Sequence, residues 1–217
     1  MISEFIGYSS IFMAYFVTAM CFLMMQRYSC TVSLGKAFMF LGLAFMFYGI
    51  AETVWYVLDY QEIEPYQNYP DIFYVGYYVF SILHVIETLR YFTTKGRTLQ
   101  LWEYLSIFLI ISVSCTVFAG LTYDIEGWLY GLPFVFASSS LGILALLGVI
   151  RVFFTKLSFT WLLIGTSILI ASFVDIHYYM IETLRGYDYG LYPVIDIAWF
   201  VTDIIMVMAI VLHRRAI

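Results

Sequence analysis

The stretch Tyr69–Phe80 reads YPDIFYVGYYVF and places a single acid, Asp71, at the head of a run of apolar and aromatic residues. The run continues with few charges to residue 92. About 20 predominantly apolar residues are enough to cross the hydrocarbon core of a bilayer as a helix. The stretch therefore predicts a membrane-spanning helix over residues 71–92, with Asp71 at its boundary with water.

The whole chain has the composition of a membrane protein. It has 217 residues, of which 63% are hydrophobic and 12% charged, and its mean hydropathy is +0.90. Soluble domains carry about 25% charged residues. We predict an all-α, multi-pass protein of the cell membrane with seven transmembrane helices and no soluble catalytic or nucleic-acid-binding domain. The predicted spans are residues 5–25, 34–58, 71–92, 101–122, 128–154, 158–183 and 194–213.

Lysine and arginine residues fall almost entirely in alternate connections. The residues of this set are Arg27, Lys36, Arg90, Lys95, Arg97, Arg151, Lys156, Arg214 and Arg215, and only Arg185 lies in a connection of the other side. Cytoplasmic loops of membrane proteins carry an excess of basic residues. The pattern predicts that the N-terminus is outside and the C-terminus inside. The connections on the outer side are acidic and rich in tyrosine.

An internal repeat is visible in the acids and tyrosines of the spans. Aligning residues 34–58 with 158–183, and then allowing a two-residue shift, pairs Glu52 with Asp175, Tyr56 with Tyr179, Tyr69-Pro70 with Tyr192-Pro193, and Asp71 with Asp196. Two three-helix units in parallel orientation need one extra helix between them. We therefore predict a 3+1+3 parallel repeat within one domain, 1–217, with repeat A at about 5–92, a linking helix at about 101–122 and repeat B at about 128–213.

Acidic side chains inside a span are costly and usually mark a functional site. A pseudo-twofold axis would bring the paired acids together in the outer half of the bundle. Asp203 lies seven residues after Asp196 and extends the same helix face toward mid-membrane. The candidate ligand-binding residues are these acids and the aromatic residues beside them: Glu52, Trp55, Tyr56, Asp71, Tyr74, Tyr78, Asp175, Tyr179, Asp196, Trp199 and Asp203.

Carboxylates without a basic neighbour must hold a cation, share protons, accept hydrogen bonds or face water. Oxygen ligands suit Ca²⁺, Mg²⁺ or Mn²⁺, and a histidine ligand would favour Mn²⁺ or Zn²⁺. A divalent cation is thus a candidate cofactor, with Glu52, Asp71, Asp175, His177 and Asp196 as candidate ligands. Structural alternatives stay open. Asp71 and Asp196 can serve as helix N-caps, and the deeper acids can have a purely structural role as hydrogen-bond acceptors.

The remaining polar residues of the spans favour ordinary roles. Glu87 precedes Arg90 by three residues, which predicts an ion pair on the helix surface at the inner end. His213 adjoins two arginines and is interpreted as interfacial charge. His84 and His177 differ in depth, so a haem is not expected. No lysine lies inside a span, so a retinal Schiff base is not expected either.

The motif around Asp71 resembles a pattern in the seven-span N-terminal sensor regions of prokaryotic signalling proteins, which precede diguanylate-cyclase or histidine-kinase domains. That pattern reads approximately Pro-Ser-x-Ala-Asp-x-Phe-Tyr-Leu-x-Gly-Tyr. The matching residues are Pro70, Asp71, Phe73, Tyr74, Gly76 and Tyr77, and the preceding Glu52-Thr-Val-Trp55 is also similar. The resemblance implies a signal-input module. No output domain follows in this chain, so a separate cytoplasmic signalling protein is an expected partner.

The sequence favours a non-enzymatic sensor or receptor-like module in the lipid bilayer. We expect it to bind a small ligand or cation in an outward-facing cavity lined by acids and aromatic rings. The alternative is a cation- or proton-coupled transporter of a small solute, with its site at the repeat interface and Asp203 as its deepest acid. The hydroxyl cluster Ser138-Ser139-Ser140 is interpreted as small residues at a helix contact rather than as a nucleophile.

Overall fold

The computed structural model describes residues 2–63, 69–93, 111, 113–115, 125–152, 158–183 and 192–215. This part of the chain is helical and contains no strand. Its long helices are α1 (Ile2–Tyr28), α2 (Ser33–Tyr60), α3 (Tyr69–Thr93), α5 (Ile125–Val152), α6 (Ser158–Thr183) and α7 (Tyr192–Arg215). All six are long and apolar enough to cross a membrane. For the described residues, the prediction of an all-α architecture with several helices able to span a membrane is therefore confirmed.

The six helices match six of the predicted spans, and each observed end lies within a few residues of the predicted one. The remaining predicted span, 101–122, lies almost wholly outside the described residues. Only Ile111 and Val113–Cys115 of that span are described, and they are helical. The agreement has a simple physical cause. In lipid the backbone must satisfy its own hydrogen bonds, so a long apolar run forms a helix along its whole length.

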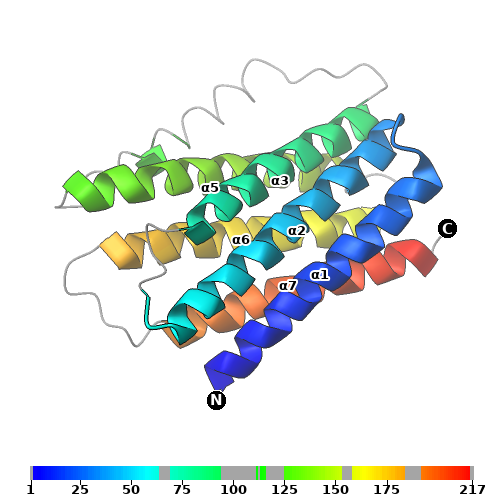
Figure 1. Cartoon of the computed structure of the whole chain (residues 1–217). Coiled ribbons are helices and arrows are strands. Elements are labelled where there is room, and N and C mark those ends of the chain that lie inside the picture. Colours follow the sequence, from blue (N-terminus) through cyan, green and yellow to red (C-terminus); the bar gives the residue numbers. More distant parts are fainter. Residues whose placement is uncertain are drawn as a thin grey trace.

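The helices form a closed ring. Neighbours along the chain pack against one another from α1 to α3, α3 packs on α5, α5 on α6 and α6 on α7, and α7 closes the ring on α1. Figure 1 shows the helices lying alongside one another, with the two chain termini at opposite ends of the bundle. One end of the bundle therefore contains the C-terminal ends of α1, α3 and α7 and the start of α2. We call it the basic end, because it carries Arg27, Lys36, Arg90, Arg214 and Arg215.

Two prolines lie in the first turns of α3 and α7. Pro70 and Pro193 are each the second residue of their helix, a place where the missing N–H is not needed. Because the helices begin before the prolines, Asp71 lies in the first turn of α3 and Asp196 lies one turn into α7. Neither residue occupies the N-cap position, so the N-cap alternative is wrong for both. Asp71 still faces the positive end of the helix dipole.

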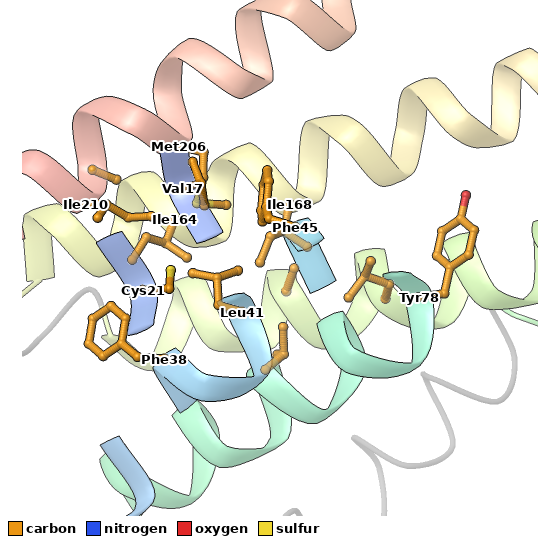
Figure 2. Close-up of a cluster of buried hydrophobic side chains, with 14 of the residues drawn as sticks. Val17, Cys21, Phe38, Leu41, Phe45, Tyr78, Ile164, Ile168, Met206 and Ile210 are labelled. Atoms are coloured by element: carbon orange, nitrogen blue, oxygen red, sulfur yellow. The ribbon is translucent and has the colours of Figure 1, made fainter. Parts of the chain in front are cut away.

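The buried apolar core includes residues of all six described long helices. In Figure 2, Cys21 of α1, Leu41 of α2, Ile164 of α6, and Met206 and Ile210 of α7 gather in the part of this core that lies toward the basic end. All five side chains are buried.

Two glycines let the helix backbones approach closely around this core. A Cβ on Gly42 would lie 3.1 Å from the Cβ of Cys21, and a Cβ on Gly165 would lie 2.6 Å from Cγ2 of Val149. Small residues at such contacts are characteristic of packed membrane helices.

Polar residues near the basic end confirm one prediction and correct another. Arg90 donates to Glu87 at 2.6 Å, as the three-residue spacing predicts. His213, in contrast, is fully buried and shares a hydrogen bond of 2.9 Å with the Tyr28 hydroxyl. Its interpretation as interfacial charge is wrong. Because His213 follows Ile210 by three residues, it lies on the face of α7 that packs into the core rather than beside the exposed arginines.

Candidate functional site

A cavity of about 340 Å³ lies at the end of the bundle opposite the basic end. It is enclosed by α2, α3, α6 and α7, and Ile6, Gly7 and Ser10 of α1 complete its wall. Its size falls at the lower end of the range of about 300–1,000 Å³ typical of small-molecule sites. The structure places all eleven residues predicted from the sequence to bind a ligand in the wall of this one cavity.

Glu52 of α2 is held by α3. The hydroxyl of Tyr74 donates to Glu52 Oε1 at 2.7 Å. Tyr74 lies three residues after Asp71 in the first turns of α3. The residue at which α3 begins therefore also determines how deep the Tyr74 hydroxyl lies in the bundle. A hydrogen bond to a carboxylate is stronger than one between neutral groups. The contact therefore fixes the glutamate side chain against one wall of the cavity.

Asp175 of α6 joins four helices through its two oxygens. Trp199 Nε1 of α7 donates to Oδ1 at 2.8 Å, and the hydroxyl of Tyr78 of α3 donates to Oδ2 at 2.8 Å. Ser138 of α5 in turn donates to the Tyr78 hydroxyl at 3.0 Å. Asp175 is 8% exposed and Tyr78 is 5% exposed. This buried network therefore fixes the relative positions of α3, α5, α6 and α7 around the cavity.

Asp203 of α7 is the deepest acid of the cavity. It lies seven residues after Asp196, which corresponds to about 10 Å along the helix. Its side chain is 5% exposed, and the Ser10 hydroxyl is directed at it. Among the described residues, Asp203 Oδ2 has no hydrogen-bond partner although it is buried. A buried carboxylate oxygen without a donor is costly, so the Asp203 side chain, which lines the cavity, lacks one donor that a ligand or water could supply if the side chain turned toward the space.

The wall combines acids with aromatic rings. Six acids line it: Glu52, Asp59, Asp71, Asp175, Asp196 and Asp203. Ten aromatic side chains line it as well: Phe45, Tyr48, Trp55, Tyr56, Tyr74, Tyr77, Tyr78, Tyr178, Tyr179 and Trp199. The lining within the described part of the chain includes no lysine, arginine or histidine. Both the carboxylates and the faces of the rings attract positive charge. The described lining is therefore electrostatically suited to a positively charged group and unsuited to an anion.

His177 lies apart from the other predicted metal ligands. Its side chain is exposed, and its Nδ1 donates to the Phe173 carbonyl oxygen at 3.0 Å. It follows Asp175 by two residues, or about 200° around the helix axis, and so faces away from the cavity. Within the described helices no three His, Cys, Asp or Glu side chains lie close enough together to hold a metal ion. A divalent cofactor stays a prediction.

The contribution of α1 to the site was not predicted. Gly7 lies directly against the ring of Tyr56, because a Cβ on Gly7 would lie 1.5 Å from the Tyr56 hydroxyl oxygen. Ser10 faces Asp203. The predicted span 5–25 contains no acid, so its sequence does not mark this helix as part of the site. Tyr48 was also missed, although its position four residues before Glu52 places both on one helix face.

No protein family model matches this sequence, and comparisons with curated proteins and with solved structures also give no match.

Proposed function

We propose that the chain is a seven-helix sensor or receptor-like module of the cell membrane, with its N-terminus outside, that binds a small ligand in an outward-facing cavity. The observation that carries the proposal is the asymmetry of the bundle along its axis. An acidic, aromatic cavity occupies one end, and a packed core with basic residues beyond it occupies the other. Basic residues favour the cytoplasmic side, which directs the cavity outward.

The internal repeat gains support from matched hydrogen bonds. Glu52 and Asp175 are paired by the repeat, and each accepts a hydrogen bond from the helix that follows it. The donors are Tyr74, three residues after Asp71, and Trp199, three residues after Asp196, so the donors are also a pair. The order of helices around the ring places α1, α2 and α3 opposite α5, α6 and α7. A parallel repeat with an axis along the membrane normal requires this arrangement.

The packing below the cavity favours a receptor over a transporter. His84 of α3 is buried, donates from Nδ1 to the Ala37 carbonyl oxygen at 2.8 Å and stacks on Trp161 at a centroid distance of 6.2 Å. Phe38 packs on the same indole at 5.5 Å. The space beside His84 measures about 20 Å³. These contacts fill the bundle around His84 with packed side chains, as expected of a receptor that opens to one side only.

The helices that hold the ligand site also reach the basic end. Tyr74 and Tyr78 lie on α3, which continues to Arg90, and Trp199 lies on α7, which continues to the terminal arginines. A ligand that displaces these side chains would shift continuous helices, and such small helix movements are an established way to transmit a signal. We propose that a separate cytoplasmic signalling protein reads this movement, as the resemblance to sensor regions implies.

A cation- or proton-coupled transporter is the second candidate. The observation that favours it is the buried carboxylate of Asp203, whose Oδ2 has no hydrogen-bond partner among the described residues, because transporters place their coupling groups near mid-membrane. A transporter must expose this site to both sides in turn. A receptor exposes it to the outside only.

Side-specific cysteine labelling distinguishes the two. Ala171 lines the cavity and is only partly buried, so an Ala171→Cys variant with Cys21 and Cys115 changed to alanine reports on cavity access. The exposed native Cys30, at the basic end, serves as the reporter of the other face.

For the receptor, an uncharged, membrane-impermeant maleimide modifies the introduced cysteine in right-side-out vesicles and Cys30 in inside-out vesicles. Modification of the introduced cysteine from both sides would support the transporter. Modification of the introduced cysteine only in inside-out vesicles, with Cys30 modified in right-side-out vesicles, would contradict the proposed orientation.

A further inference from the structure

We infer that the ligand of the cavity is a small organic ammonium ion, with its charged nitrogen at Asp203 and its body among the aromatic rings. This inference rests on the proposed ligand-binding function and adds the chemical class of the ligand. Three observations support it: the negative charge of the cavity lining, the hydrogen bonds that each deep carboxylate already accepts, and the aromatic side chains that surround the space.

The deep carboxylates differ in what they can still accept. Both oxygens of Asp175 already accept hydrogen bonds from Tyr78 and Trp199. Asp203 has a buried oxygen, Oδ2, without a partner in the described part of the chain, and it lines the same cavity. Of these two carboxylates, Asp203 is therefore the one that still lacks a donor, and a ligand can supply it when the side chain turns toward the cavity. A protonated amine can donate an N–H to this carboxylate. A quaternary ammonium has no N–H and is attracted to the carboxylate by its charge.

The aromatic lining fits the body of such a ligand. Tyr74 and Tyr78 direct their hydroxyls at carboxylates, so their rings are fixed in orientation by these bonds. Trp199 is fixed in the same way and packs on Tyr178 at a centroid distance of 5.1 Å. Rigid aromatic cages are the usual receptors for alkylated ammonium groups, because the ring faces attract the cation without the need to hydrate it.

A bare metal ion and an anion fit less well. A divalent ion needs several oxygen ligands at once, and the described helices bring no three potential ligand side chains together. The space of about 340 Å³ also far exceeds the volume of one ion. An anion would face six carboxylates with no basic residue in the described lining. The outer acids, such as Asp71 and Asp196, would instead attract an organic cation toward the cavity mouth.

The test uses the full chain in lipid nanodiscs, with choline as the probe and 3,3-dimethylbutan-1-ol as its uncharged isostere. Calorimetric titrations are carried out at ionic strength matched with NaCl. We expect saturable binding of choline and at least tenfold weaker binding of the isostere. Equal affinities for the two compounds would overturn the inference, and so would no saturable choline binding. Because this comparison uses the unchanged protein, it does not depend on whether a variant folds.

The residue assignment is tested with Asp203→Asn, which should weaken choline binding at least tenfold. Glu62→Gln is the matched control, because Glu62 follows α2 at the same end of the bundle and does not line the cavity. Undiminished choline binding by Asp203→Asn would overturn the assignment.

Failure of the ammonium assignment can be distinguished from failure of the receptor function. If the isostere or the corresponding carboxylate, 3,3-dimethylbutanoate, protects Ala171→Cys from modification while choline does not, the cavity binds a ligand and only the cationic class is wrong. If the introduced cysteine is modified from the Cys30 side, the receptor function is wrong whichever compound binds.

Discussion

Removing the hydroxyl of Tyr78 is the sharpest test of the network that shapes the cavity. In the folded protein this hydroxyl donates to Asp175 Oδ2 at 2.8 Å and accepts from Ser138 Oγ at 3.0 Å. Tyr78→Phe keeps the ring and its packing on Phe134 but leaves both partners without this contact. Tyr78 is 5% exposed, so water can reach the vacated position only through the cavity that this side chain lines.

The expected cost follows from the two bonds. A hydrogen bond to a charged group contributes about 1.5–3 kcal/mol in soluble proteins, whereas bonds between membrane helices average about 0.6 kcal/mol with a maximum of about 1.7 kcal/mol. Asp175 borders a cavity that water can enter, so we use the range measured in soluble proteins. Because Asp175 also keeps its bond from Trp199, we take the lower part of that range. Tyr78→Phe should lower the free energy of unfolding by about 2 kcal/mol, a change of roughly 30-fold in the equilibrium constant.

The assay is reversible unfolding in mixed micelles at increasing denaturing detergent. Tyr60→Phe is the control, because Tyr60 is 90% exposed, and it should change the stability by less than about 0.5 kcal/mol. A double-mutant cycle with Asp175→Asn should give a coupling energy of about 1 kcal/mol or more. If Tyr78→Phe is as mild as the control and the coupling is zero, the hydroxyl does not hold the buried carboxylate.

Two further predictions concern packing and the repeat. Gly35→Ala should destabilise the bundle by several-fold more than Gly148→Ala in the same unfolding assay. A Cβ on Gly35 would lie 1.9 Å from the backbone oxygen of Ser29, whereas one on Gly148 would meet nothing nearer than 3.9 Å; equal effects would contradict the close approach of the α1–α2 connection to the start of α2. Tyr74→Phe and Trp199→Phe each remove one donor to a cavity acid, so each should cost about 1–2 kcal/mol, and a loss from only one of them would argue against equivalent roles.

The helices were predictable because lipid allows few alternatives. Apolar runs of sufficient length must form helices that satisfy their own backbone, and the predicted spans differ from the described helices by a few residues only. The site was also largely predictable. Acids at matched positions in α2 and α6, and in α3 and α7, had to face inward to avoid lipid, and they share one cavity in the structure.

The wrong predictions concern the direction in which a residue faces around its helix and the residue at which a helix begins. His213 was assigned by its arginine neighbours, but a helix turns about 100° per residue, so adjacent residues face different surroundings and His213 is buried. The same rotation takes His177 away from Asp175. Asp196 was expected at the end of its helix, but Pro193 is compatible with a first turn and α7 begins earlier. Charged residues mark the inward face of a helix most clearly, and the predicted span 5–25 contains none.

The central claim is that the cavity is acidic and accepts cations from the end opposite the basic residues. The most direct measurement compares the modification rates of Ala171→Cys by two thiosulfonate reagents of similar size, one cationic and one anionic, in right-side-out vesicles. The account predicts that the cationic reagent reacts faster by about tenfold or more, since a carboxylate-lined cleft raises local cation concentration by that order. The ratio should fall as salt is added. Equal rates, or a faster anionic reagent, would contradict the account.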